Sequence, residues 1–205
     1  LNETVYWFCG LALGLMPAAF RYQHADHHTY TQNIQRDPQM IPIAEKLGGF
    51  LYYATAIPYF REILRMLGAY ALGWPNATDR RVFPAGDLPV IRREAWVFLG
   101  VYGGIAVISA WFGSYAALIY WILPRIVGES VERMVRMSEH VGCARSPDML
   151  ENSRTILTRA PYRWLCWNMP FHSAHHAVPQ VPFHALPALN ALLSAHLQEV
   201  RHSYP

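Results

Sequence analysis

The chain has 205 residues, a formal net charge of +3, 53% hydrophobic residues and only 15% charged residues. Soluble domains average about 25% charged residues, so this composition favours a membrane protein. The basic residues stand beside apolar runs and do not alternate with aromatic residues on one polar face, which argues against nucleic-acid binding. The three cysteines form no C-x-x-C pair, so the sequence predicts neither a disulfide framework nor a zinc knuckle.

Two apolar segments of the N-terminal half are candidates for contact with lipid. Residues 4–20 carry no charge, but they only reach the lower edge of the roughly 17 to 25 residues that a membrane-spanning helix needs. This first segment is therefore expected either to span the membrane or to lie at its surface. Residues 47–60 are too short to cross and contain Pro58, which favours an interfacial or re-entrant helix.

The longest apolar run covers residues 95–127. It contains no acidic residue and a single basic one, Arg125, near its end. The run is long enough for two short crossings, and Gly113 and Ser114 offer a turn between them. The sequence therefore predicts a transmembrane hairpin over residues 95–127.

Basic residues flank this run at both ends, at Arg92, Arg93, Arg125, Arg133 and Arg136. Both flanks favour the cytoplasmic side, because Lys and Arg accumulate in cytoplasmic loops. A hairpin satisfies both flanks at once. It also places His24 and His172 on the same side of the membrane.

Histidines gather in two H-x-x-H-H boxes, one with His24, His27 and His28 and the other with His172, His175 and His176. A random order of 10 histidines in 205 residues gives only about 0.02 such matches. Residues at i, i+3 and i+4 share one face of a helix, so each box presents three imidazoles toward one point. Six clustered imidazoles in a membrane protein are costly unless they bind something, which indicates a metal site.

His140 lies between the boxes and follows the predicted hairpin, so it should return to the same side and is a seventh candidate. Seven imidazoles exceed the four ligands of a tetrahedral zinc ion, so two metal ions are indicated. The soluble di-iron bundles carry a pair of E-x-x-H motifs, whereas this chain has a single match, Glu199 to His202, outside the boxes. The H-E-x-x-H motif of zinc proteases is absent. The sequence thus predicts a site dominated by imidazole.

The stretches HADHHTYTQNIQRDP, SEHVG and WNMPFHSAHHAVPQVPFHALP resemble the second histidine box, the intermediate histidine and the third box of the membrane fatty acid desaturase and hydroxylase family. The resemblance runs from Leu1 to about residue 193. The family has a further H-x-x-x-H box shortly before a stretch like LNETVYWF, and this box is missing here. On that basis the chain is expected to be truncated before the first box and to lack two of the family's ligands.

The resemblance implies a di-iron centre with the ligands His24, His27, His28, His140, His172, His175 and His176. Asp37 is expected to orient one of these imidazoles from outside, as Asp26 or Glu139 could also do. Where some desaturases hold a metal-bound water with an asparagine, this chain has Arg136, and Asn168 is the candidate replacement. Asn152 and Arg154 are expected to brace the helix before the third box.

The remaining histidines match no ligand position of the family, and we expect them at the surface: His184, His196 and His202. The fold implied is all-α, a membrane helical bundle with the transmembrane hairpin and a cytoplasmic histidine-rich helical cap, in a single domain over residues 1–205. The Ala-, Leu- and Arg-rich composition suits a bacterial inner membrane.

The activity implied by the resemblance is fatty acid desaturation, within fatty acid biosynthesis and lipid metabolism. Two iron ions, O2 as co-substrate and an extended acyl chain are required. No G-x-G-x-x-G fingerprint of a flavin or nicotinamide site is visible, so electrons are expected from a ferredoxin or a cytochrome b5-like protein. Hydroxylases and carotenoid ketolases share the boxes and remain alternatives. Alternatives of another class are a membrane zinc hydrolase and an inert metal-binding fragment.

Overall fold

The computed structural model describes residues 1–41 and 46–204, and within them the chain is mostly helical with a single pair of two-residue strands. This agrees with the all-α fold expected from the sequence. The chain divides into two compact units. Unit 1 comprises Leu1–Ala25 and Ala44–Arg133, and unit 2 comprises Asp26–Ile43 and Met134–Pro205. Each unit is described by itself below.

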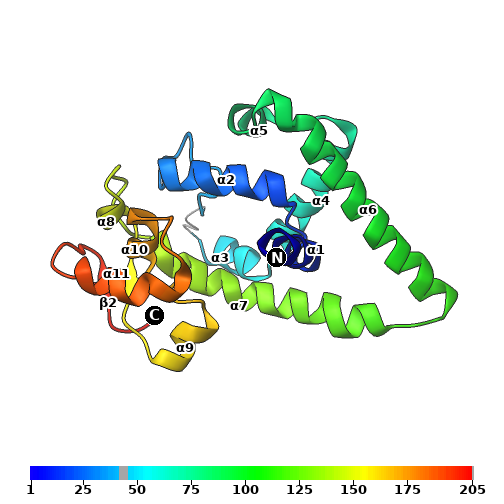
Figure 1. Ribbon diagram of the computed structural model, residues 1–205. Coiled ribbons are helices and arrows are strands. Elements are labelled where there is room, and N and C mark those ends of the chain that lie inside the picture. The colour runs from blue at the N-terminus through cyan, green and yellow to red at the C-terminus, as the bar shows by residue number, and fades with distance from the viewer. Residues whose placement is uncertain (42–45, 205) are drawn as a thin grey trace. The chain divides into compact units, whose positions relative to one another are not determined.

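Unit 1 begins with two short helices in place of one continuous apolar helix (Figure 1). Helix α1 (Asn2–Leu13) ends at Gly14, whose φ of 81° is easily adopted only by glycine. Helix α2 (Pro17–Tyr30) begins at a proline, which suits a first turn. The two helices differ in direction by 92°. The segment is therefore bent, and the pair of helices is apolar enough to count together as one broken span or a re-entrant loop. Whether it spans the membrane or lies at its surface stays a prediction.

The second apolar segment forms helix α3 (Leu47–Ala54) and the start of helix α4 (Ile57–Leu72). The break falls at Ala56, which has a φ of 59°. Helix α4 ends at Gly73 and is followed by helix α5 (Ala77–Val82), where Asn76 and Asp79 cap each other's backbone N–H groups in a capping box. A 3₁₀ turn (Ala85–Asp87) then leads into helix α6 (Leu88–Trp111).

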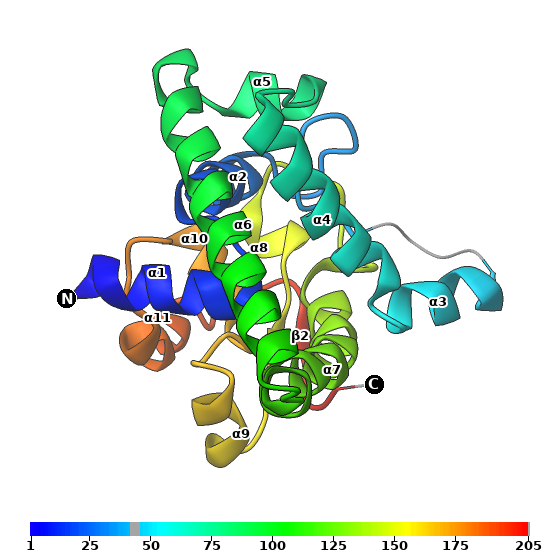
Figure 2. The same cartoon turned by 90° about the vertical axis from the view of Figure 1, so that its right-hand side faces the viewer.

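The core of unit 1 is apolar and forms mainly between α4 and α6. Leu67, Tyr70 and Ala71 share one face of α4, and Ile91, Ala95 and Phe98 share one face of α6. Met16, Ala19 and Phe83 complete this cluster. Figure 2 shows α5 joining the C-terminal end of α4 to the N-terminal end of α6.

Helix α6 changes character along its length. Its N-terminal half supplies buried residues, whereas its C-terminal part exposes large apolar side chains, among them Val107, Ile108 and Trp111. The continuous helical segment Ala85–Trp111 is long and apolar enough to cross a membrane, and only 17% of its apolar window is buried. Among the described residues it is the one single helix that passes this test.

A turn follows α6 where the sequence predicts one. Gly113 has a φ of 58°, and its N–H donates to the carbonyl of Ala110. The chain then re-enters a helix through a π-helical turn (Leu118–Ile122) and continues as helix α7 (Leu123–His140). That both limbs of this hairpin cross a membrane stays a prediction.

Unit 2 is built from the ends of α2 and α7 and from short C-terminal elements: α8 (Met149–Asn152), β1 (Thr155–Ile156), α9 (Ala160–Leu165), α10 (His172–Ala177), a 3₁₀ turn (Phe183–Ala185), α11 (Leu186–Leu192) and β2 (Val200–Arg201). Strands β1 and β2 pair in parallel, Thr155 with Val200 and Ile156 with Arg201. Helix α10 packs against α8, α11 and β1, which lie around it in Figure 1.

The interior of unit 2 is small and polar. Its apolar cluster contains only Phe171, Ala174 and Leu186. Asn152, Ser153, Thr155 and Ser173 are completely buried beside it. Their polar atoms are paired, since Ser173 donates to the carbonyl of Ser153 at 2.8 Å and Thr155 donates to Asn190 at 3.2 Å. The bond from Ser173 ties α10, which carries the His172 box, to the segment before β1, and the bond from Thr155 ties β1 to α11.

Candidate metal centre

Three helices supply the candidate histidines. His24, His27 and His28 lie on α2, His140 is the last residue of α7, and the second box forms most of α10. The H-x-x-H-H spacing therefore falls on helices in both boxes, so the members of each box share a face.

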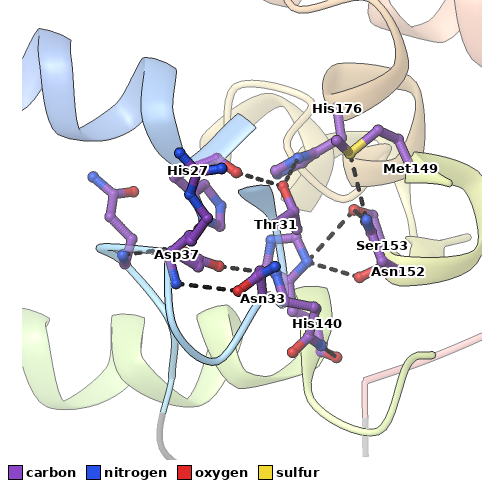
Figure 3. A network of polar contacts seen from close by, with 12 residues as sticks. His27, Thr31, Asn33, Asp37, His140, Met149, Asn152, Ser153 and His176 are labelled. Carbon is purple, nitrogen blue, oxygen red and sulfur yellow. Dashed lines mark hydrogen bonds and ion pairs between the residues drawn. The ribbon is translucent and has the colours of Figure 1, made fainter. Parts of the chain in front are cut away.

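A buried trio forms the centre of unit 2. His27, His140 and His176 come from three different helices, and one ring nitrogen of each lies within 4.8 Å of the others. Their ring centroids are 5.1 Å (His27–His140), 5.0 Å (His27–His176) and 4.7 Å (His140–His176) apart. Figure 3 shows the three side chains around Thr31. Three imidazoles in this arrangement could hold a metal ion.

His172 closes this group. Its Nε2 atom lies 2.9 Å from Nε2 of His140 and 3.1 Å from Nε2 of His176. Its Nδ1 atom lies 3.7 Å from a carboxylate oxygen of Glu139. The structure therefore brings four of the seven candidate histidines together in one group: His27, His140, His172 and His176.

Two further candidates lie beside the four. The ring of His28 stacks on His176 with centroids 4.1 Å apart, and His175 meets His28 edge-on at 4.5 Å. His24 belongs to unit 1, where its ring stacks on Phe20 at 5.3 Å. Its position as a ligand stays a prediction.

Each member of the buried trio has an outer partner on its Nδ1 atom. His27 Nδ1 lies 2.8 Å from Asp37 Oδ1, and the carboxylate of Asp37 also accepts the backbone N–H groups of Gln32 and Gln39. His140 Nδ1 donates to the backbone carbonyl of Asn152 at 3.0 Å. His176 Nδ1 lies 3.1 Å from Thr31 Oγ1. Contacts of this kind set the orientation of metal-binding imidazoles.

Burial keeps the rings of His140, His172 and His176 neutral by lowering their pKa values. Burial, with the neighbouring His27 as the next cause, lowers the pKa of His140 to about 3. Burial and His176 lower the pKa of His172, and burial and His140 lower that of His176. Neutral imidazole is the form that binds metal.

The count of protons shows that the residues fit a cation. A carbonyl oxygen only accepts, so the Nδ1 atom of His140 must carry its proton, and its Nε2 atom presents a lone pair to the cluster. The same holds for His176 if Thr31 accepts from its Nδ1 atom. His172 Nε2 stands within 3.1 Å of both of these nitrogens, and its single proton could satisfy only one of them. A bound cation removes this conflict, because every lone pair then has a partner.

A small cavity adjoins the trio. Its volume is about 10 Å³, room for about one water molecule. Its walls are formed by His27, Gln32, Asp37, Gln39, Met40, Ile41, His140 and Val141. The cavity is far too small for an acyl chain.

The remaining residues that the sequence analysis singled out do not belong to the buried histidine group. Asn168 has a φ of 58°, and its side chain donates to the carbonyl of Phe183 at 3.1 Å, which gives it a turn-forming role. The side chain of Asn152 donates to the carbonyl of Ser146 at 2.9 Å, and that of Arg154 donates to the carbonyl of Ser138 at 2.7 Å. That these two residues brace the helix before the His172 box stays a prediction. His184, His196 and His202 are exposed.

The sequence analysis did not predict two of the groups that contact Nδ1 atoms of the buried histidines, the carbonyl of Asn152 and the hydroxyl of Thr31. The carbonyl of Asn152 is a backbone group, so no residue type could have indicated it. Thr31 did leave a signal, because it lies four residues after His27 on the same helical face and three after the end of the first box.

The comparisons with known proteins bear on the whole chain. The profile of the family described as fatty acid desaturase matches residues 1–205. Searches of curated proteins and of solved structures found no significant match. The match covers both histidine boxes, the intermediate histidine and the apolar helix α6. This chain therefore belongs to the fatty acid desaturase family.

Proposed function

We propose that the protein is a membrane di-iron oxidoreductase that uses O2 and external electrons to introduce a double bond into a fatty acyl chain. Family membership supports an O2-dependent oxidoreductase, and helix α6 supports membrane association. The observation that carries the proposal is the convergence of three buried imidazoles whose Nδ1 atoms each contact an outer partner.

His27, His140, His172 and His176 would hold one ion, because their facing nitrogens form the buried group. His28 and His175, which lie beside that group, would contribute to a second ion together with His24. Two iron ions, when bound, supply the activation of O2 and the removal of hydrogen from an unactivated C–H bond.

The chain's own residues orient the ligands and exclude water. Asp37, with a side chain only 2% exposed, holds the Nδ1 proton of His27 and so directs Nε2 inward. The carbonyl of Asn152 does the same for His140. Because His140, His172 and His176 are buried and stay neutral far below pH 7, they are ready to bind metal without first losing a proton.

Substrate and partners follow from the family. We propose an acyl-chain substrate bound from the lipid phase and a ferredoxin or a cytochrome b5-like protein as electron donor. The basic residues Arg92 and Arg93 before the apolar run, and Arg133 after it, favour a cytoplasmic position for the histidines.

Product analysis tests this function. The protein, reconstituted with iron, a reducing system and acyl lipids, should convert the acyl chain to a product that has lost two hydrogens, and only when O2 is present. A product that gains one oxygen would identify a hydroxylase or ketolase instead. Turnover without O2 or reductant would contradict the proposal and favour a membrane zinc hydrolase.

A further inference from the structure

We infer that Thr31 is a positioning residue for the metal centre: its hydroxyl holds His176 with Nε2 facing the other imidazoles and ties the first histidine box to the second. The inference rests on the proposed function, because it names a residue that prepares that same site. Thr31 lies outside both boxes, and its hydroxyl meets the Nδ1 atom of His176 and not the Nε2 atom that faces His172.

The hydroxyl of Thr31 stands between the two boxes (Figure 3). Thr31 is 4% exposed. Its Oγ1 atom donates to the backbone carbonyl of His27 at 2.6 Å and lies 3.1 Å from Nδ1 of His176. His176 lies 145 positions further along the chain. One hydroxyl therefore connects the end of α2 to α10 at the centre of unit 2.

The proton of this hydroxyl decides the tautomer of His176. A hydroxyl has one proton to give and two lone pairs with which to accept. The shorter contact, to the carbonyl of His27, takes the proton, because a carbonyl oxygen cannot donate. Nδ1 of His176 must then be the donor in the second contact. Its Nε2 atom is left as a lone pair, 3.1 Å from Nε2 of His172.

The other two outer partners cannot be tested as cleanly. The partner of His140 is a backbone carbonyl, which no substitution removes. Asp37 carries a charge and also accepts two backbone N–H groups of the following loop, so its removal disturbs more than one histidine. Thr31 is neutral and differs from valine only by the hydroxyl. It therefore isolates the effect of one hydrogen bond on one imidazole.

The experiment compares Thr31→Val with Thr31→Ser, which restores the hydroxyl, and with Thr29→Val, a control at an exposed position of the same helix. The first readout is the side-chain ¹⁵N spectrum of histidines in the metal-free protein, which distinguishes Nδ1–H from Nε2–H. The signal of His176 is identified by its loss in His176→Asn. The second readout is the affinity for ferrous iron, measured by competition with a chelator.

Thr31→Val should give a mixture of tautomers at His176 and bind iron about 10 to 100-fold more weakly, as expected for loss of an outer partner. Thr31→Ser and Thr29→Val should resemble the wild type in both readouts. If Thr31→Val does not fold, Thr31→Ala removes the same hydroxyl.

Two results would overturn the inference: an unchanged tautomer and affinity in Thr31→Val, or a loss in Thr31→Ser as large as that in Thr31→Val, which would assign the effect to packing. The spectrum of the metal-free protein needs no iron. A wild type that binds no iron would therefore refute the proposed function while the tautomer readout still decides the role of Thr31.

Discussion

The two units of this protein have opposite interiors. Unit 1 buries a continuous apolar cluster between α4 and α6, with Leu67, Ile91 and Phe98 at its centre. Among the described residues, unit 2 has a three-residue apolar cluster, and most of its buried side chains are histidines, hydroxyls and amides. Apolar packing therefore stabilises unit 1, whereas hydrogen bonds between buried polar groups stabilise unit 2.

This difference predicts different sensitivities. Burial of apolar surface contributes about 25 cal/mol per Å² and does not depend on pH or metal. A buried polar interior is stable only when its groups are paired, and each unpaired group costs about 1–3 kcal/mol. Unit 2 should therefore respond to protons and metal ions, whereas unit 1 should respond to changes of side-chain volume.

The largest effect is expected for the central histidine of unit 2. His176→Ala removes an imidazole that faces both His140 and His172. Acyl oxidation should fall by more than the about 100-fold that the loss of an outer partner can cause, with iron lost and membrane insertion intact. His184→Ala, at an exposed histidine outside the cluster, is the matched control. Retained turnover in His176→Ala would refute its assignment as a ligand.

The apolar unit should fail in another way. Phe98 is completely buried, and Phe98→Ala should destabilise the protein by about 3–5 kcal/mol because it leaves a cavity. Its neighbour Leu99 is 37% exposed, so Leu99→Ala should cost much less. Thermal unfolding in detergent measures both. Folded Phe98→Ala protein should keep its iron content. Loss of iron from the folded variant would contradict the expectation that the apolar core of unit 1 does not affect metal binding in unit 2.

A smaller effect is expected at the outer partner of His27. Asp37→Asn weakens the contact that fixes the Nδ1 proton, so iron affinity should fall by about 10 to 100-fold. Asp148→Asn, at the N-cap of α8 in the same unit, keeps a good capping residue and should change affinity little. Chelator competition measures both variants. Equal affinities would remove Asp37 from the site.

Unit 2 should also respond to acid. The pKa of His140 is lowered to about 3 in the folded protein. Below about pH 6.5 this histidine is therefore protonated in the unfolded chain but still neutral in the folded chain. Stability present above pH 6.5 is therefore lost as the pH falls toward 3, by up to about 1.4 kcal/mol per pH unit for each such histidine.

Melting temperatures of the metal-free protein between pH 7.5 and 5.5 measure this loss. Iron should oppose it, because metal binds the neutral form of the ring. A melting temperature that stays constant over this range would contradict the account of unit 2.

Much of this structure was accessible from the sequence because it depends on short-range patterns. The i, i+3, i+4 spacing predicted that both boxes fall on helices, and the apolar run with Gly113 predicted the end of α6. The bend between α1 and α2 was not predicted, because the uniform apolarity of residues 4–20 indicates contact with lipid but not where a helix breaks.

Long-range polar contacts left weaker signals. The parallel pairing of β1 with β2 joins residues 45 positions apart and involves only two residues in each strand. The contact of His140 with Asn152 uses a backbone carbonyl, which every residue type has. The positive φ of Asn168 is likewise not predicted by the residues beside it in the sequence. Such contacts depend on how distant segments meet, which periodicity does not encode.

Elemental analysis distinguishes the proposed di-iron centre from a zinc site or an empty one. Protein purified from iron-replete cells should contain about two iron ions per chain, since seven imidazoles exceed the ligands of one ion, and this content should fall in His176→Ala but not in His184→Ala. One zinc ion per chain that iron does not replace on reconstitution, or no metal at all, would contradict the account.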